Sequence, residues 1–90
     1  MSTMISDAEM ILLAIFKELQ EKMPNFEKGI HNEVGVAFEY VTPALIELEQ
    51  EGFIKGIIWV KSEVDQTEIP SFSNVSITPA GMVKVIELLK

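Results

Sequence analysis

Few residues in this chain have the types and spacing that catalysis or metal binding requires. The sequence contains one histidine, His31, and no cysteine. A histidine can act as a general base, but no nucleophile motif, second metal ligand or glycine-rich phosphate loop accompanies this one. Glu47 and Glu51 are one helical turn apart, yet the carbonyl-rich loop or Asp-x-Asp pattern of a hard-cation site is missing. We therefore expect no catalytic, metal-binding or cofactor-binding residues, and a protein that is not an enzyme.

The chain is strongly acidic. Fourteen acidic residues oppose seven basic ones, which gives a net charge of −7, and every basic residue is a lysine. Arginine makes the most common specific contact with a base and forms the best fork for a phosphate. Its absence from the sequence argues against a protein that reads DNA.

Length and composition bound the class of protein. The 90 residues, of which 48% are hydrophobic, suit one folded domain that spans residues 1–90. The N-terminus lacks the pattern of a signal peptide. The longest apolar run, residues 10–16, is much shorter than the roughly 20 residues that cross a bilayer. We expect a cytoplasmic protein.

The first helix has the clearest signals. Ser6 is a suitable N-cap, Glu9 is its capping-box partner, and the helix is expected to end at Pro24. Its apolar run at residues 10–16 contains no polar residue, which predicts burial on more than one side. Glycines interrupt the pattern of residues 26–41, where we expect a short linker or strand and then a short helix.

Two Thr-Pro pairs mark the starts of further helices. Thr42 suits an N-cap and Pro43 the first helical position, and this helix should stop at Gly52, which favours a left-handed backbone. Its core side should carry Val41, Leu45 and Leu48. The second pair, Thr78-Pro79, precedes a last helix over residues 80–89.

The segment between these helices predicts a hairpin. Residues 53–61 and 74–78 have the β-branched and alternating patterns of strands. The polar residues 62–73 between them, which include a proline, predict a long loop. We expect Trp59 to pack the hairpin on the helices together with its neighbours on one face (Ile57, Val75 and Ile77).

This order of elements predicts an α+β fold of the winged-helix type, with three to four helices and a β-hairpin wing. Residues 41–54 resemble the third helix and strand entry of many bacterial winged-helix regulators, and residues 77–81 resemble the entry to the helix after the wing. More narrowly, the stretch of residues 33–57, from Glu33-Val34-Gly35-Val36 through Gly52-Phe53-Ile54-Lys55-Gly56-Ile57, resembles the YjcQ-type family of small proteins from Gram-positive bacteria and their prophages, largely of unestablished function. The resemblance implies a fold and a part in regulation, including that of transcription, but no reaction.

A DNA-reading surface in such a fold would consist of the third helix and the wing. Residues 42–51 carry three glutamates and no base, and residues 61–74 carry Lys61 against three acidic residues. Acidic side chains repel phosphates, so this surface has the wrong sign for DNA. If DNA is bound nevertheless, the residues available for contacts are Thr42, Gln50, Lys55 and Lys61.

Protein contacts suit the same surface better. The outward side of the third helix presents Pro43, Ile46, Glu47 and Gln50. Phe72 lies in the polar loop, where nothing nearby in the sequence would bury it. These five residues are our candidates for binding another protein, and the acidic charge of this surface would suit a basic partner.

The first and last helices have more apolar surface than one small core needs. A homodimer would bury the excess, and sandwiching of the first helix within one chain is the alternative. The candidate interface residues are Met10, Leu13, Val85, Ile86 and Leu89.

The sequence thus predicts a non-enzymatic regulatory or adaptor module that acts through protein contacts. A DNA-binding transcriptional regulator is the first alternative, and a ligand-sensing domain with a small molecule between the helices of the dimer is the second.

Overall fold

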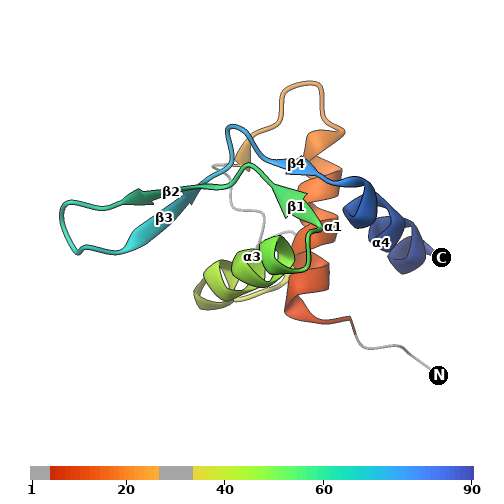
Figure 1. Ribbon diagram of the computed structural model, residues 1–90, viewed down its shortest axis with the longest axis horizontal. Coiled ribbons are helices and arrows are strands. Elements are labelled where there is room, and N and C mark those ends of the chain that lie inside the picture. Colours follow the sequence, from red (N-terminus) through yellow and green to blue (C-terminus); the bar gives the residue numbers. More distant parts are fainter. Residues whose placement is uncertain (1–4, 27–33) are drawn as a thin grey trace.

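The computed structural model describes residues 5–26 and 34–90, which form three α-helices and two small antiparallel sheets (Figure 1). The α+β class is therefore confirmed. Part of the predicted linker and short helix at residues 26–41 lies outside the described residues. In chain order, the elements are α1 (Asp7–Leu19), a short 3-10 turn η2 (Phe38–Tyr40), α3 (Val41–Gln50), β1 (Ile54–Lys55), β2 (Ile58–Lys61), β3 (Glu68–Ser71), β4 (Ser76–Ile77) and α4 (Pro79–Leu89).

The central helix is α1, and its start follows the predicted capping box. The Ser6 hydroxyl accepts a hydrogen bond from the Glu9 backbone N–H at 3.1 Å, and the Glu9 carboxylate accepts one from the Ser6 N–H at 2.9 Å. Both α3 and α4 pack against α1, so its apolar run is buried on more than one side, as expected.

The predicted end of α1 at Pro24 is wrong, because the helix stops at Leu19. Glu18, which is 2% exposed, accepts a hydrogen bond from the backbone N–H of Asn25 at 2.8 Å. This hydrogen bond folds the chain back at the end of the helix. The sequence did not predict it, because a single bond from a backbone N–H to a glutamate side chain leaves no periodic pattern of residues.

The start of α3 also differs from the prediction. The helix begins at Val41, and the N-cap is Tyr40, which makes no side-chain capping bond, so Thr42 is not the cap. The turn η2 leads directly into α3 with Tyr40 already in a helical conformation (φ −95°, ψ −3°). Pro43 still lies in the first turn, where its missing N–H costs no hydrogen bond.

The end of α3 is the one predicted at Gly52, which has φ +77°. The Gly52 N–H donates to the carbonyl of Glu49, and the Phe53 N–H donates to that of Leu48. This pair of bonds is a Schellman motif, in which a left-handed residue after the helix satisfies its last carbonyls.

The predicted strand at residues 53–61 is divided into β1 and β2, the one at residues 74–78 is shortened to β4, and the predicted loop at residues 62–73 contains β3. β1 pairs with β4, and β2 pairs with β3, both antiparallel. Gly56, with φ +89°, separates β1 from β2, and a side chain there would overlap the Asn74 carbonyl oxygen. Strand β3 was missed because it contains Pro70, which is compatible with a strand only at an edge.

One apolar core joins the helices to the β1–β4 sheet. We call β2, β3 and the turn at residues 62–67 the distal hairpin, because it projects away from the helices (Figure 1). Most of the buried residues come from α1, α3, β1, the residue before β4, and α4, and they include Ile11, Leu12, Ile15, Leu45, Leu48, Ile54, Val75 and Val85.

Candidate functional site

The exposed side of α3 is acidic and apolar. Val41, Ala44, Leu45 and Leu48 are buried, so the predicted core side of this helix is confirmed. The opposite side exposes Pro43, Ile46, Glu47 and Gln50, as expected, and Ile46 is 42% exposed. α3 itself contains no basic residue.

One face of the distal hairpin is apolar and exposed. The register places Val60 opposite Ile69 and Ile58 opposite Ser71, and side chains alternate between the two faces of a strand. Ile58, Val60 and Ile69 therefore share one face, and they are 45%, 52% and 53% exposed. Exposed apolar side chains that gather on one small element are a feature of protein-binding surfaces.

Trp59 connects the hairpin to α3. Its indole Nε1–H donates to the Glu49 carboxylate at 3.3 Å, and its side chain is half-buried. Ile57 and Val75 are buried in the core, as the alternating pattern predicted. The contact with Glu49 places α3 beside the face of the hairpin that carries Trp59, whereas Ile58, Val60 and Ile69 lie on the opposite face.

The turn of the hairpin is held by Asp65. Its carboxylate accepts hydrogen bonds from the Thr67 hydroxyl at 2.7 Å and from the Thr67 backbone N–H at 3.2 Å. These bonds hold the pKa of Asp65 below its ordinary value, so the side chain stays ionised. The adjacent Gln66 has φ +64°, and Val64 is 95% exposed. The tip thus combines fixed negative charge with an exposed apolar side chain.

We call the exposed side of α3 together with the distal hairpin the acidic face. Residues 42–51 and 58–71 together carry a net charge of −5, with Lys61 as their only cation. Acidic side chains repel a phosphate backbone, and Lys61 is the only cation in these ranges to offset them. Its charge suits a basic partner.

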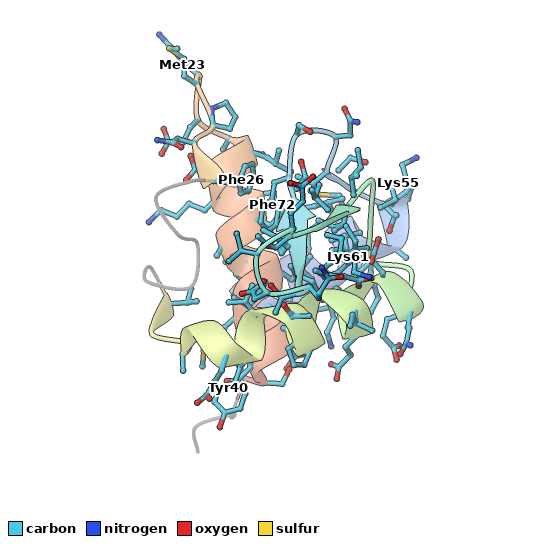
Figure 2. All side chains as sticks on the ribbon, turned by 90° about the vertical axis from the view of Figure 1, so that its left-hand side faces the viewer. Met23, Phe26, Tyr40, Lys55, Lys61 and Phe72 are labelled. Carbon is cyan, nitrogen blue, oxygen red and sulfur yellow. The ribbon has the colours of Figure 1, made fainter. Side chains whose placement is uncertain are left out.

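The residues that could contact DNA do not form a basic patch. Thr42 is half-buried in the first turn of α3, and Gln50 is exposed near its end. Lys55 and Lys61 are exposed but lie on separate strands, β1 and β2, and Figure 2 shows them apart. His31 lies outside the described residues, and within residues 5–26 and 34–90 no three His, Cys, Asp or Glu side chains gather as a metal site would require.

Phe72 is not the isolated loop residue that we expected. Its ring stacks on that of Phe26 with centroids 4.9 Å apart and an angle of 11° between the planes (Figure 2). Phe72 is half-buried and packs against the core. The expectation that nothing would bury it is wrong, because its partner lies 46 residues away in the sequence.

Phe26, which the sequence did not single out, forms one wall of a groove with Phe72. The groove has a volume of about 790 Å³, and most of its lining is apolar (Leu19, Pro24, Phe26, Val60, Ile69, Pro70, Phe72 and Val75, with Asn25, Ser71 and Ser73). The buried Glu18 carboxylate holds Asn25 and so positions Phe26 at its end of the groove.

The predicted dimer residues divide between the core and the surface. Val85 is fully buried, so its assignment to an interface is wrong: it faces the core that α4 shares with α1. Met10 and Leu13 are half-buried, whereas Ile86 and Leu89 are 54% and 63% exposed.

Two exposed residues of α4 that the prediction missed, Met82 and Val83, lie near Ile86 at helical spacing. Leu89 also lines a hollow of about 390 Å³ with residues of α1 and the two residues that follow it (Leu13, Phe16, Lys17, Gln20 and Glu21). We call Met82, Val83, Ile86 and Leu89 the α4 stripe.

The described part of the chain is thus an α+β domain whose acidic face also carries exposed apolar side chains. None of its helices is long and apolar enough to cross a membrane. No family model, curated protein or solved structure matches the chain.

Proposed function

We propose that this chain is a non-enzymatic regulatory or adaptor module on a winged-helix scaffold, related to the YjcQ-type family, and that it acts through protein contacts. The order of α1, α3, a projecting hairpin and α4 supports the scaffold. In this interpretation α3 takes the place of the helix that reads DNA in other winged-helix proteins, and the distal hairpin takes the place of the wing.

The observation that carries the proposal is the composition of the acidic face. It combines a net charge of −5 with five exposed branched apolar residues, each at least 42% exposed (Ile46, Ile58, Val60, Val64 and Ile69). Binding to DNA would place these acids near phosphates and gain nothing from the apolar side chains. A protein partner with basic and apolar groups would use both.

The experiment that tests this proposal measures binding of short basic peptides. The probes are nine-residue peptides of alternating lysine and valine, with glutamate-valine peptides for comparison. We expect the lysine peptides to bind and salt to weaken the binding. The double variant Glu47→Lys/Glu63→Lys should weaken it about tenfold or more, because like charges then face each other.

Glu87→Lys is the control. It makes the same substitution, glutamate to lysine, at an exposed residue of α4 that lies outside the acidic face. The double variant reverses two charges and the control reverses one. If the loss of affinity per reversed charge is the same in both, the peptide is attracted to the net charge of the whole molecule and not to the acidic face. Equal binding of the glutamate peptides would also contradict the proposal.

The proposal includes a homodimer through the α4 stripe. Its four residues are between 37% and 63% exposed, and exposed apolar side chains that gather on one face mark protein-interaction sites. The hollow beside it has one lysine and one glutamate, Lys17 and Glu21, in its lining. A mixed-charge rim can pair with itself across a two-fold axis, whereas the acidic face would repel its own copy.

A further inference from the structure

The two outer edges of the distal hairpin differ in their capacity to bind another strand. The Ser62 N–H donates to the Thr67 carbonyl at 2.7 Å, so this pair directs its backbone groups inward, between the strands. In an antiparallel pair the inward and outward directions alternate along each strand. With the observed register, Trp59 and Lys61 of β2 and Glu68 and Pro70 of β3 therefore direct their backbone groups outward.

Pro70 blocks the outer edge of β3. It has no N–H, so an added strand would lose a hydrogen bond and meet the proline ring at that position. This outward orientation also explains why β3 tolerates a proline: the missing N–H is not one that pairs with β2.

The outer edge of β2 has no such block. Its outward N–H groups belong to Trp59 and Lys61, and within the described residues no backbone partner beyond β3 bonds to this strand. The hairpin projects from the helices (Figure 1). Ile58 and Val60 flank the free edge with exposed apolar side chains. An unpaired edge with apolar side chains is a template for strand addition.

The charges around this edge select the chemistry of the added strand. Glu63, Asp65 and Glu68 lie on the same hairpin, and Glu49 contacts Trp59 of β2. Lys61 is the one cation among them. A second copy of the chain would bring the same acids together, whereas a lysine- or arginine-rich strand would neutralise them.

We propose that the outer edge of β2 binds an extended basic segment of a partner protein as a third strand of the distal hairpin. Backbone bonds to Trp59 and Lys61 hold the segment, and its alternate apolar side chains extend the face formed by Ile58, Val60 and Ile69. This inference rests on the proposed protein-binding function and adds to it the position and the mode of binding.

Hydrogen exchange of backbone amides tests the position. With the alternating lysine-valine peptide as probe, we expect the amides of Trp59 and Lys61 to exchange at least about tenfold more slowly in the complex, because they become hydrogen-bonded. An acidic peptide of glutamate and valine should give no protection.

Two proline substitutions test the mode of binding. Lys61→Pro removes an outward N–H from β2, and Glu68→Pro removes one from the opposite residue on the outer edge of β3. Neither change removes a bond between β2 and β3. We expect Lys61→Pro to weaken peptide binding about tenfold, because it removes one hydrogen bond to the peptide and its ring obstructs the added strand. Glu68→Pro should leave the affinity within about threefold, because it changes only the edge that the peptide does not use. Lys61→Gln controls for the lost charge and should keep the affinity, and circular dichroism checks that each variant folds.

Several results would overturn the inference. Equal losses from Lys61→Pro and Glu68→Pro would exclude strand addition at β2. Peptide binding that depends on Glu47 and Glu63 but protects neither Trp59 nor Lys61 would refute the edge site and leave the protein-binding function standing. Protection of both amides without peptide, increasing with protein concentration, would identify a second copy as the occupant. Absence of peptide binding at millimolar concentration would refute the inference and the proposed function together.

Discussion

Phe72→Ala tests the stacked pair that joins the end of α1 to the distal hairpin. Truncation of a fully buried phenylalanine costs about 3–5 kcal/mol, so half-buried Phe72 should cost about 2 kcal/mol. For a domain of this size each kcal/mol lowers the melting temperature by about 4–8 °C, which predicts a decrease of about 8–16 °C. Differential scanning calorimetry measures the change. Val64→Ala is the control, because Val64 is 95% exposed at the hairpin tip and its loss should have little effect.

A double-mutant cycle with Phe26 separates stacking from general loss of apolar contact. The rings are 4.9 Å apart and nearly parallel, a geometry that contributes about 0.5–1.5 kcal/mol beyond burial. Phe26→Ala and Phe72→Ala should therefore be non-additive by about this amount. A decrease of only a few degrees for Phe72→Ala, or strict additivity of the pair, would refute the role of the stack.

Three further changes have defined outcomes. Gly81→Ala should destabilise the fold by about 2 kcal/mol, although alanine is normally favoured in helices, because the added carbon would overlap the Phe53 carbonyl oxygen; an unchanged urea midpoint would refute this. The pKa of Glu9 lies below its ordinary value of 4.5. Its carboxylate accepts a hydrogen bond from the Ser6 backbone N–H and lies 3.0 Å from the Lys84 ammonium, and both groups favour the charged form. A carboxyl group whose pKa is depressed by folding stabilises the folded state at pH values above its ordinary pKa. This stabilisation is lost as the pH falls through the depressed pKa. Glu9→Gln should accordingly melt a few degrees lower than the wild type at pH 7, and the difference should close as pH falls below 4.5; a constant difference down to acid pH would exclude the charge as its cause. Ile86→Lys should convert the proposed dimer to monomer in sedimentation equilibrium, and a wild-type monomer at tens of micromolar would contradict the dimer.

The elements set by neighbouring residues could be predicted from the sequence. The capping box at Ser6 and Glu9 acts within one turn, and the stop at Gly52 requires only a residue that accepts positive φ. The core side of α3 follows from helical spacing alone. The exposed candidates on its other side followed from the same spacing, so the α3 part of the acidic face was predictable, whereas the exposed apolar side chains of the distal hairpin were not.

The features that depend on residues distant in sequence could not be predicted. Phe72 is half-buried because Phe26 lies against it, and no local pattern connects the two. β3 contains a proline, which normally indicates a loop, and only the register with β2 shows that its missing N–H faces outward. Val85 looked like one more residue of an apolar helix, and its burial is decided by where α1 contacts α4.

The central claim, that the acidic face binds protein and not DNA, is tested most directly by fluorescence anisotropy of a labelled random DNA duplex pool. The titration begins at about 50 mM salt, where phosphate contacts are strong, and continues at higher salt. We predict no binding at any salt concentration, because α3 has no cation and the acidic face carries a net charge of −5. Binding that weakens steeply with salt, with a log–log slope of several units, would demonstrate phosphate contacts and contradict the claim.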